Sequence, residues 1–409
     1  MCKDEVITEL LGIQDWKLEN IEVNRLTGNI KLQIERIDGL AYECSGCGQL
    51  FTIAYDHYPA RVIEDLPAWG RKTFIEFSQA RVFCSKCGGV QAEKLEWVEA
   101  YQHQTVRYQR YLATLCDFMP VADVAELTGL SKDALYRIDK RYLKERRENH
   151  CKDHKVSYLG IDEIAVKKGH KYATVFYDLE RGEVIGLVES RKQRRVSSFF
   201  RRWGKEHCKE VIAVCTDLWA PFHNSVKIYL KQADLVFDKF HVFKYLSDAI
   251  DEVRRNEQRE AEDEGKILLK GCRWIMLKKN LTRKQKRKLK EVMEENQNIA
   301  KAMILKESFS AFYEAETAEE ALEVLEEWTE QCEESELKPF KTLAKRLNRW
   351  KDGILAYFTH KITNGMSEGI NNKIKVIKRR SYGFRDMDYF FLKILKATGF
   401  IPDMREVYP

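Results

Sequence analysis

The sequence predicts a multidomain α/β protein, and three observations lead to this fold class. Two Cys-x-x-Cys pairs lie among strand-like runs near the N-terminus. Farther along, three successive strand-like runs are followed by alternating helical and strand-like segments, and a long helical stretch then precedes a last amphipathic helix. With 409 residues, of which 44% are hydrophobic, the chain can form two to four domains that each have a core.

Charge and cysteine content restrict the class of protein. The 70 Lys and Arg and 64 Asp and Glu residues give a net charge of only +6, which is weak support for a polyanionic partner. Lys and Arg nevertheless gather at 191–202, 278–290 and 373–380, where they either neutralise phosphates or form solvated helix faces. The chain shows neither an 18-residue apolar run nor a secretion signal, so we expect a cytoplasmic protein without a membrane partner. Eleven cysteines in that compartment are not expected to form disulfides.

The first domain is expected at 1–99 and contains the two cysteine pairs. A glycine follows the second cysteine of each pair, which allows the backbone to fold its amide groups toward thiolate sulfurs. Four thiolates bind Zn²⁺ tetrahedrally, and the strands between the pairs, predicted at 31–37 and 73–82, would bring them together. The alternative is a set of unrelated reduced cysteines. The predicted ligands of a structural Zn²⁺ are Cys44, Cys47, Cys84 and Cys87.

Residues 100–150 carry the pattern of a helix-turn-helix. The small side chain of Ala125 allows two helices to cross closely, Gly129 suits the turn, and Leu135 would bury the second helix. Ser131 is a favourable N-cap for this second helix. A plain helical hairpin gives a similar pattern and is the alternative. In a helix-turn-helix, the expected DNA contacts on the recognition helix are Lys132, Tyr136 and Arg137.

The α/β region follows. Strands are expected at 156–161, 172–177, 184–188, 211–216 and 234–237, with a helix after each of the last three. Short turns at 168–170 and 180–182 would join the first three strands as antiparallel neighbours. Three antiparallel strands followed by alternating helices and strands is the element order of a ribonuclease-H-like mixed sheet. We expect this domain at 151–250 plus 361–409, interrupted by an all-helical insertion at 251–360.

Two aspartates follow apolar runs of this region. Asp162 closes the run at 157–161, and Asp217 closes the run at 211–216. In a ribonuclease-H-like sheet these strand ends are neighbours, so the two carboxylates can converge; each one alone also suits a loop-capping residue. Together with Glu368 they would form a hard oxygen-ligand set for Mg²⁺ or Mn²⁺. Two such ions about 3.5–4 Å apart catalyse phosphoryl transfer, so these three residues are the expected catalytic and metal-binding acids.

Glu368 belongs to a helix-patterned stretch at 364–380. At about 100° per residue its polar residues fall on one face, and Ile370, Ile374 and Ile377 cluster on the opposite side. A lone acid among phosphate-binding side chains suits a metal ligand beside a nucleic-acid backbone. The alternative is an ordinary amphipathic helix with a solvated basic face. The expected DNA contacts on the face of Glu368 are Asn371, Asn372, Lys375 and Arg379.

A further pair, Asp238 and His241, begins the helix after the strand at 234–237. Near the active edge of the sheet, His241 could steady the scissile phosphate or a flanking strand, and Asp238 could orient the imidazole. We expect both to support catalysis; the alternative is an N-cap aspartate with a half-buried histidine. Glu163 faces the opposite side of its strand from Asp162, so we expect it to support the site or to lie at the surface.

Three motifs carry a family resemblance. They read Gly160-Ile161-Asp162-Glu163, Thr216-Asp217-Leu218-Trp219-Ala220-Pro221-Phe222 and Asn364-Gly365-Met366-Ser367-Glu368-Gly369-Ile370-Asn371-Asn372. Together they resemble a DDE transposase, and more narrowly the ISL-three family of bacterial insertion-sequence transposases. The resemblance spans nearly the whole chain, because the cysteine pairs, the helix-turn-helix and the helical insertion also belong to the plan of that family.

The resemblance implies a bacterial, nucleoid-associated enzyme that binds the terminal inverted repeats of an insertion sequence and cleaves and joins DNA. Its partners would be the double-stranded DNA of the element ends and of the target, and the synapsis of two ends implies a homodimer or a larger assembly. Two alternatives are a nuclease without strand transfer and a catalytically inactive, transposase-derived DNA-binding regulator. The intact set of three acids argues against the regulator.

Overall fold

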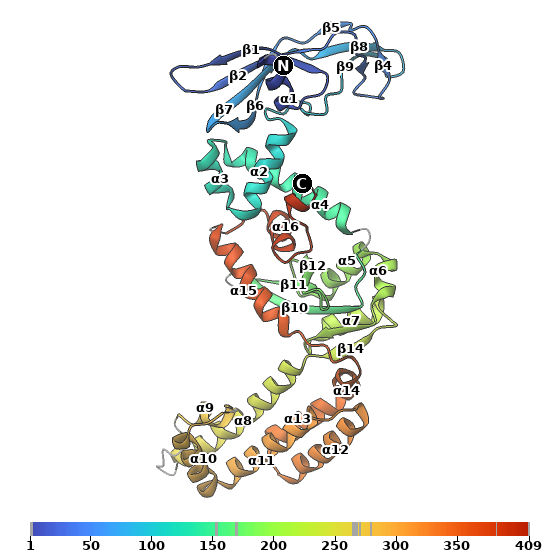
Figure 1. The fold of residues 1–409 in the computed structure, drawn as a ribbon. Helices are drawn as coiled ribbons and strands as arrows, with labels where there is room; N and C mark the ends of the chain where they lie inside the picture. Colours follow the sequence, from blue (N-terminus) through green and yellow to red (C-terminus); the bar gives the residue numbers. More distant parts are fainter. Residues whose placement is uncertain are drawn as a thin grey trace. The chain divides into compact units, whose positions relative to one another are not determined.

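The computed structural model of the chain describes residues 3–151, 154–167, 171–263, 269, 271–278, 280–381 and 383–407 (Figure 1). The chain divides into two compact units, one formed by Met1–Asn149 with Pro402–Pro409 and the other by His150–Ile401. The turn predicted at 168–170 lies outside the described residues. None of the described helices combines the length and the apolar character that a membrane crossing requires.

The first unit begins with short strands. Its elements there are α1 (Lys3–Leu11), β1 (Trp16–Val23), β2 (Ile30–Arg36), β3 (Tyr42–Glu43), β4 (Leu50–Phe51), β5 (Asp56–His57), β6 (Arg61–Ala68), β7 (Arg71–Phe77), β8 (Ala80–Cys84) and β9 (Gly89–Ala92). They form sheets in the orders β1-β2-β7-β6, β3-β4 and β5-β8-β9. The run predicted as one strand at 73–82 is therefore two strands, because β7 pairs within the first sheet and β8 pairs with β5 and β9.

Three helices complete the N-terminal part of this unit, and a fourth comes from the C-terminal end of the chain. They are α2 (Val106–Phe118), α3 (Val121–Thr128), α4 (Lys132–Cys151) and α17 (Met404–Val407). Met404 is 1% exposed and lies in the same core as Leu112, Val124 and Leu135. The backbone N–H of Met404 donates to Asp117 Oδ2 at 3.1 Å. The C-terminal residues therefore belong to the core of the helix-turn-helix.

The second unit is built on a five-stranded mixed sheet in the order β12-β11-β10-β13-β14. The strands are β10 (Tyr158–Lys167), β11 (Lys171–Asp178), β12 (Glu183–Val188), β13 (Ala213–Thr216) and β14 (Asp234–Phe237). β10, β11 and β12 pair antiparallel, whereas β13 pairs parallel with both β10 and β14. The sequence correctly predicted the number of these strands, their order along the chain and their approximate positions.

Helices pack on both faces of this sheet (Figure 1). Neighbouring residues of a strand face opposite sides, and β11 shows this at Phe176 and Tyr177. Phe176 stacks on Phe199 of α5 with ring centroids 3.7 Å apart, whereas Tyr177 hydrogen-bonds to Asn371 of α15 at 3.3 Å. The helices next to this sheet are α5 (Gln193–Trp203), α6 (Lys205–Glu210), α7 (Ala220–Tyr229), α15 (Gly365–Arg380) and α16 (Met387–Ala397).

The helical insertion has a continuous apolar core of its own, which includes Phe237 at the end of β14. Its helices are α8 (Lys239–Asp263), α9 (Arg273–Leu277), α10 (Arg283–Glu295), α11 (Gln297–Phe312), α12 (Ala318–Glu334), α13 (Lys338–Arg349) and α14 (Lys351–His360). α8 is a single helix that starts directly after β14 and runs through residue 250. α14 returns to β14, and glycine is needed at Gly353 because a Cβ there would lie 2.6 Å from the ring of Phe237. Both ends of the insertion are thus anchored at the same edge of the sheet.

Candidate functional site

The four predicted zinc ligands come together in the first unit. The Sγ atoms of Cys44 and Cys87 are 3.9 Å apart, and those of Cys47 and Cys84 are 3.6 Å apart. All four sulfurs lie within 4.8 Å of one another. A tetrahedron with Zn–S bonds of about 2.3 Å has S–S edges of about 3.8 Å, so the spacing suits Zn²⁺.

The electrostatics of the cysteine cluster also suit a cation. Burial acts to raise the pKa of Cys44, but hydrogen bonds from the backbone N–H groups of Gly46 and Cys47, together with those to the side chains of Cys84 and Cys47, lower the pKa to about 7. Hydrogen bonding to Cys47 contributes most to raising the pKa of Cys87, which reaches about 12. Without a cation, one thiolate therefore keeps a neighbouring thiol protonated. Gly46 leaves room for this packing, because a Cβ there would lie 2.8 Å from Cys87 Sγ.

The helix-turn-helix has the predicted turn and cap. Gly129 ends α3 in the left-handed conformation, with φ of 74°, and donates its N–H to the carbonyl of Ala125 at 2.8 Å. Ser131 Oγ accepts the N–H of Ala134 at 3.2 Å and so caps the start of α4. Leu135 is fully buried, as predicted.

The residues predicted to contact DNA lie in the first two turns of α4. Lys132 and Arg137 are exposed, and Tyr136 is half-buried. The hydroxyl of Tyr136 accepts a hydrogen bond from Lys140 Nζ at 3.3 Å, and Arg137 Nε donates to the carbonyl of Asp133 at 3.2 Å. These side chains are accessible on one stretch of α4, and their contact with DNA stays a prediction.

Three aspartates lie side by side where the parallel pairing of β10, β13 and β14 ends. They are Asp162, Asp217 and Asp238, each following the last parallel pair of its strand. β10 itself continues to Lys167 by pairing with β11, so the prediction that Asp162 ends its strand is wrong. The predicted proximity of Asp162 and Asp217 nevertheless follows from the register.

Asp217 lies in an environment that disfavours its negative charge. Burial and the nearby carboxylates of Asp162 and Glu163 raise the pKa of Asp217 to about 7. Within the described residues, its buried Oδ1 has no hydrogen-bond partner. A buried carboxylate oxygen without a partner, next to a second carboxylate, is suited to bind a hard cation.

Asp238 links α8 to the beginning of α15. It is 4% exposed, and its burial raises the pKa of the carboxyl group, with His241 acting in the opposite direction. Its Oδ1 accepts the backbone N–H of Asn364 at 3.4 Å. The Nε2 atom of His241 lies 4.0 Å from Asp238 Oδ2, which is within ion-pair distance but too long for a hydrogen bond. The two residues are therefore neighbours, as predicted, and their role in catalysis stays a prediction.

Two asparagines fix α15 against β10, and Glu368 lies between them in sequence. Asn364 Nδ2 donates to the carbonyl of Ile161 at 3.2 Å, and Asn371 Nδ2 donates to Asp162 Oδ2 at 3.2 Å. Glu368 follows Asn364 by four residues and precedes Asn371 by three, so all three share one face. Glu368 is exposed, and in the described part of the chain it forms no hydrogen bond or ion pair. The three predicted acids are not among the described ligand groups that meet within 4.8 Å.

The rest of α15 is amphipathic, as the sequence predicted. Ile370 and Ile374 are buried and Ile377 is half-buried. The other predicted DNA contacts on this helix, all exposed, are Asn372, Lys375 and Arg379. Among the described residues, the interaction of these three side chains is a 3.5 Å hydrogen bond from Lys375 Nζ to Asn372 Oδ1.

Arg191 lies beside the acidic edge of the sheet, which is the edge with Asp162, Asp217 and Asp238, and no predicted motif includes this arginine. The guanidinium of Arg191 lies 4.6 Å from the ring centroid of Tyr172 and 5.0 Å from that of Trp219. It also lies 3.4 Å from Glu163 Oε2. Trp219 follows Asp217 by two residues, and an aromatic residue so close to a predicted catalytic aspartate was the feature of the sequence that could have indicated this cation–π contact.

A second group of ligand-type side chains is formed by His150, His154 and Glu183. Nδ1 of His154 lies 2.8 Å from a guanidinium nitrogen of Arg181 and must accept, because arginine only donates. Nε2 then carries the proton and donates to Asp178 Oδ2 at 3.1 Å. Both ring nitrogens of His154 are in use, so His154 forms a hydrogen-bond network with Arg181 and Asp178 at the turn between β11 and β12.

Two family models match the chain. A transposase model of the DDE type, from family ISL3, matches residues 159–394. A model described as the helix-turn-helix domain of transposase family ISL3 matches residues 93–143. The first match includes the acidic edge of the sheet, the insertion and α15, and the second includes α2, α3 and the beginning of α4.

Known transposases are similar to the chain over most of its length. The transposase for insertion sequence element IS1001 from Bordetella parapertussis is 32% identical over 403 residues, which cover 97% of this chain and 98% of the relative. The transposase for insertion sequence element IS1557 from Mycobacterium tuberculosis (strain H37Rv) is 24% identical over 363 residues, or 82% of this chain and 81% of the relative.

Proposed function

Because the chain belongs to the transposase family ISL3 and carries its DNA-binding helix-turn-helix, we propose that it cleaves the ends of an insertion sequence and joins them to target DNA. One observation carries this proposal. Asp162 and Asp217 directly follow the last residues that pair β10 with the parallel strand β13, and the helix that holds Glu368 is hydrogen-bonded to Asp162 through Asn371.

The proposed catalytic domain is ribonuclease-H-like and consists of 151–250 plus 361–401, without the predicted residues 402–409, because these belong to the first unit. Three antiparallel strands followed by two parallel ones, with helices on both faces, support this assignment. The helical insertion predicted at 251–360 would begin within α8, whose residues 242–250 already belong to the core of the insertion. A zinc-binding domain at 1–99 and a helix-turn-helix domain at 100–150 would precede the catalytic domain.

The residues that would hold Mg²⁺ or Mn²⁺ are Asp162, Asp217 and Glu368. Their oxygen atoms are the ligand type that these ions prefer, and the unpaired buried oxygen of Asp217 supports the choice. When bound, a pair of such ions activates a water or 3′-hydroxyl and stabilises the leaving oxygen. In the chain itself, Asn371 orients the Asp162 carboxylate, and Asp217 must give up its proton before it can bind a cation.

Asp238 and His241 would act beside these acids. Their 4.0 Å separation would allow Asp238 to orient the imidazole of His241, which could then contact the scissile phosphate. Asp238 would also hold the start of α15 through the N–H of Asn364. We therefore infer a supporting role for this pair and not a role as metal ligands.

DNA recognition would be shared among several parts of the chain. Zn²⁺ held by the cysteine cluster would fix the first domain, and the helix-turn-helix would read the terminal inverted repeats through Lys132, Tyr136 and Arg137. The phosphate contacts proposed on α15 are Asn371, Asn372, Lys375 and Arg379. Synapsis of two duplex ends with target DNA would require a homodimer or a larger assembly, acting in the bacterial cytoplasm at the nucleoid.

The test is divalent-metal-dependent cleavage of duplexes that carry the DNA flanking this gene. Glu368→Gln should bind the same duplex as the parent chain and cleave it at least about a hundredfold more slowly, a barrier increase of about 2.7 kcal/mol. Glu189→Gln, which neutralises an exposed carboxylate next to the end of β12, should cleave like the parent. Equal cleavage by Glu368→Gln and the parent would show that the proposed mechanism is wrong.

Two further results separate the alternatives. Joining of pre-cleaved ends to a target duplex distinguishes a transposase from a nuclease that does not transfer strands. A parent chain that binds the ends in Mg²⁺ or Mn²⁺ without cutting any of them would be a DNA-binding regulator.

A further inference from the structure

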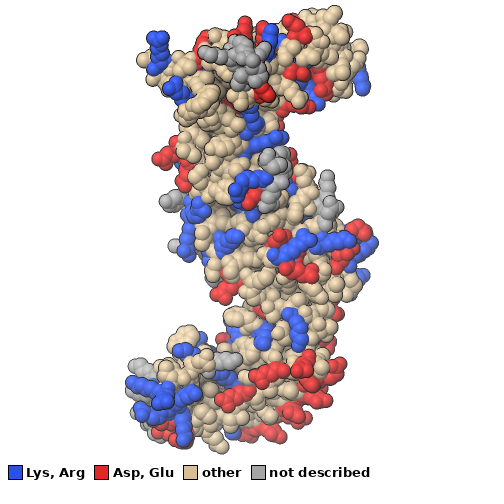
Figure 2. Space-filling model, in the orientation of Figure 1, with Lys and Arg blue, Asp and Glu red and all other residues tan. Residues whose placement is uncertain are grey.

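The helical insertion contains the most concentrated positive charge of the chain. Residues 278–290 include eight Lys or Arg residues and no Asp or Glu. Six of these cations belong to α10 and all six are exposed; we call them the α10 basic face: Arg283, Lys284, Lys286, Arg287, Lys288 and Lys290. In Figure 2 they form the blue patch at the lower left, whereas Asp and Glu gather along another edge of the insertion.

The spacing of these cations forms an ordered stripe. Four of them occupy positions i, i+3, i+4 and i+7 of the helix, which places their side chains on one side over about 10 Å. They are Arg283, Lys286, Arg287 and Lys290. The opposite side of α10 packs inward through Val292, which is 3% exposed, and through the half-buried Leu289. The helix is therefore fixed by its apolar side and presents its cations to solvent.

Most of this charge has no internal counterion. Arg287 and Lys290 each reach a glutamate one turn later, at 3.7 and 3.6 Å, and such exposed pairs contribute little to stability. In the described part of the chain, Arg283, Lys284 and Lys286 form no ion pair. The first turn of α10 also contains no acid, so its cations oppose the helix dipole. A bound polyanion would relieve both effects.

An exposed aromatic side chain lies on the neighbouring helix. Trp274 of α9 is 71% exposed, and the guanidinium of Arg273 lies 5.5 Å from its ring centroid. α9 contacts α10 directly. Exposed aromatic rings next to cations are typical of nucleic-acid contacts.

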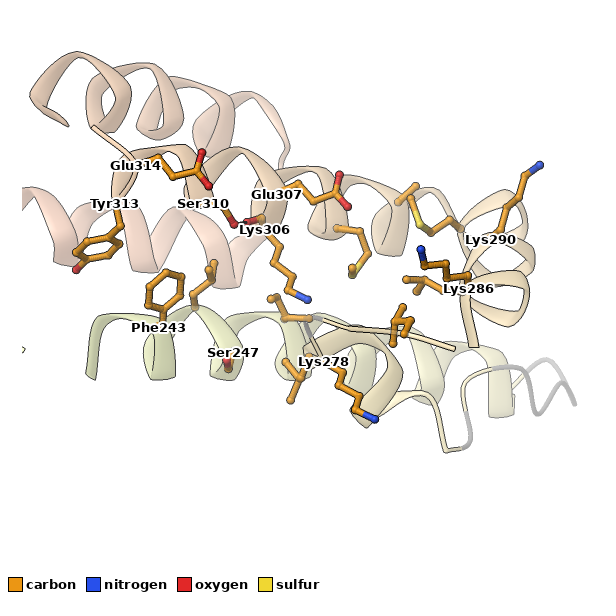
Figure 3. Close-up of a pocket in the computed structure, with 18 of the residues that line it drawn as sticks. Phe243, Ser247, Lys278, Lys286, Lys290, Lys306, Glu307, Ser310, Tyr313 and Glu314 are labelled. Atoms are coloured by element: carbon orange, nitrogen blue, oxygen red, sulfur yellow. Dashed lines mark hydrogen bonds between the residues drawn. The ribbon is translucent and has the colours of Figure 1, made fainter. Parts of the chain in front are cut away.

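A pocket of about 1080 Å³ connects the α10 basic face with the beginning of α8. Its lining residues include Lys239, which follows Asp238 at the beginning of α8, and Lys286 and Lys290 of α10. Figure 3 shows Lys306 extending from α11 across the space toward α8, with Lys286 and Lys290 at the α10 end. The lining also includes Glu294, Glu307 and Glu314 among apolar side chains, and Lys306 donates to the carbonyl of Met276 at 2.6 Å, so the exposed positive charge lies on the α10 basic face and not along the pocket.

We propose that the α10 basic face binds the phosphate backbone of the duplex DNA on which the acidic edge acts. α8 leaves Asp238 as one helix of 25 residues, or about 37 Å, so the contact lies within roughly one turn of duplex from the catalytic edge. Because phosphate contacts carry no base information, this binding is independent of DNA sequence. The inference rests on the proposed function only in that DNA is the substrate.

The first test compares two triple variants of the full chain. Arg283→Gln with Lys286→Gln and Arg287→Gln removes three cations of the α10 basic face, and all three side chains are exposed. The matched control removes three exposed cations of α13: Lys338→Gln, Lys345→Gln and Arg349→Gln. Binding of a 40-base-pair duplex (about four turns) of mixed sequence is measured between about 50 and 200 mM salt.

Loss of three phosphate contacts should reduce the slope of log K against log salt by about 2.7 in magnitude, whereas the control should leave it unchanged. An unchanged slope in the α10 variant, with normal folding by circular dichroism, would overturn the proposal. An equal decrease in both variants would also overturn it, because the effect would then come from net charge alone.

The second test uses the unmodified chain. Bound duplex should protect Lys284, Lys286 and Lys288 from acetylation, and Lys345 on α13 should react equally with and without DNA. Protection that appears without DNA as the protein concentration rises would show that a second copy covers this face, and would overturn the proposal.

Measuring both lysine protection and cleavage separates this inference from the proposed function. If DNA protects the α10 lysines but the parent chain does not cleave, the DNA contact is supported and the catalytic proposal is rejected. Normal cleavage by the parent without protection of α10 would reject the contact and leave the catalytic proposal standing.

Discussion

Asn371 of α15 donates a hydrogen bond to Asp162 of β10 at 3.2 Å, although the two residues are 209 positions apart in the sequence. The whole helical insertion lies between them. Because α8 and α14 both meet the sheet at β14, the insertion leaves and returns at one edge without displacing α15. Glu368 lies less than one helical turn before Asn371, so the hydrogen bond between Asn371 and Asp162 sets the position of Glu368 relative to Asp162.

Replacing Asn371 tests this anchor. Asn371→Ala removes one hydrogen bond to a carboxylate, and we expect it to lower the free energy of unfolding by about 1–2 kcal/mol and cleavage by roughly tenfold. Asn348→Ala, which changes an exposed asparagine of α13 away from the proposed site, should leave both unchanged. Chemical denaturation and single-turnover cleavage measure the two effects. Equal behaviour of the two variants would show that the Asn371 contact does not position α15.

Asp217 should make metal binding dependent on pH. Because its pKa is about 7 in the metal-free protein, a cation must displace a proton below that pH. We expect the apparent affinity for Mn²⁺ to rise about tenfold per pH unit from pH 5 to 7 and to level off above pH 7. Titration calorimetry in several buffers measures the affinity and the released proton. An affinity that stays constant over this range would contradict the assignment.

The same aspartate should reduce stability as pH rises. Between about pH 4 and pH 7 the folded chain holds a proton on Asp217 that the unfolded chain has lost, so this contribution is present at low pH and disappears toward pH 7. Asp217→Asn removes the dependence and should stabilise the metal-free protein at pH 8 by about 2–4 kcal/mol. Thermal unfolding at pH 5 and pH 8 gives the comparison, and a variant that is less stable at pH 8 than the parent would refute it.

Cys44→Ser should remove one bound zinc ion per chain. Cys44 is fully buried among the other three sulfurs, and the loss of a ligand from a structural site removes folding energy directly. Cys208→Ala, at a buried cysteine of the second unit, should keep its zinc. Metal analysis of the purified chains measures the difference. Equal zinc content in both variants would exclude the four-cysteine site.

Gly160→Ala should disturb the acidic edge without changing its carboxylates. A Cβ at Gly160 would lie 2.7 Å from Leu179 Cδ2 and 2.9 Å from Asn364 Oδ1, so we expect a cost of about 1–3 kcal/mol. Gly369→Ala is the control, because space is open around that helical glycine and alanine should add up to about 1 kcal/mol. Denaturant unfolding should move the two variants in opposite directions. A shift in the same direction would contradict this packing.

Local sequence patterns were sufficient for much of the second unit. The apolar runs before Asp217 and Asp238 correctly predicted β13 and β14, because each run is short, buried and followed at once by a polar residue. The same reasoning placed the end of the first strand too early at Asp162. β10 continues past Asp162 because it still pairs with β11, and this pairing cannot be recognised from the pattern of apolar residues in the sequence.

Contacts between distant segments were not predictable from local patterns. Asn364 is an ordinary polar residue in the sequence, yet it contacts Asp238 and the carbonyl of Ile161. Arg191 was assigned to a basic segment, and its position between Tyr172 and Trp219 depends on the arrangement of three separate elements. Such partners are chosen by the tertiary fold, and the local pattern of the sequence carries no information about them.

Met404 makes the core of the helix-turn-helix dependent on synthesis of the chain as far as this residue. Ribosomes add about 5–20 residues per second, so about 13–50 s separate the appearance of Cys151 from that of Met404. During that interval the helices have a gap in their core, and the N–H that Asp117 accepts does not yet exist. Fragments from interrupted translation or from proteolysis before Met404 keep the same gap. Finished chains should therefore outcompete their own fragments for DNA, which limits interference by truncated copies.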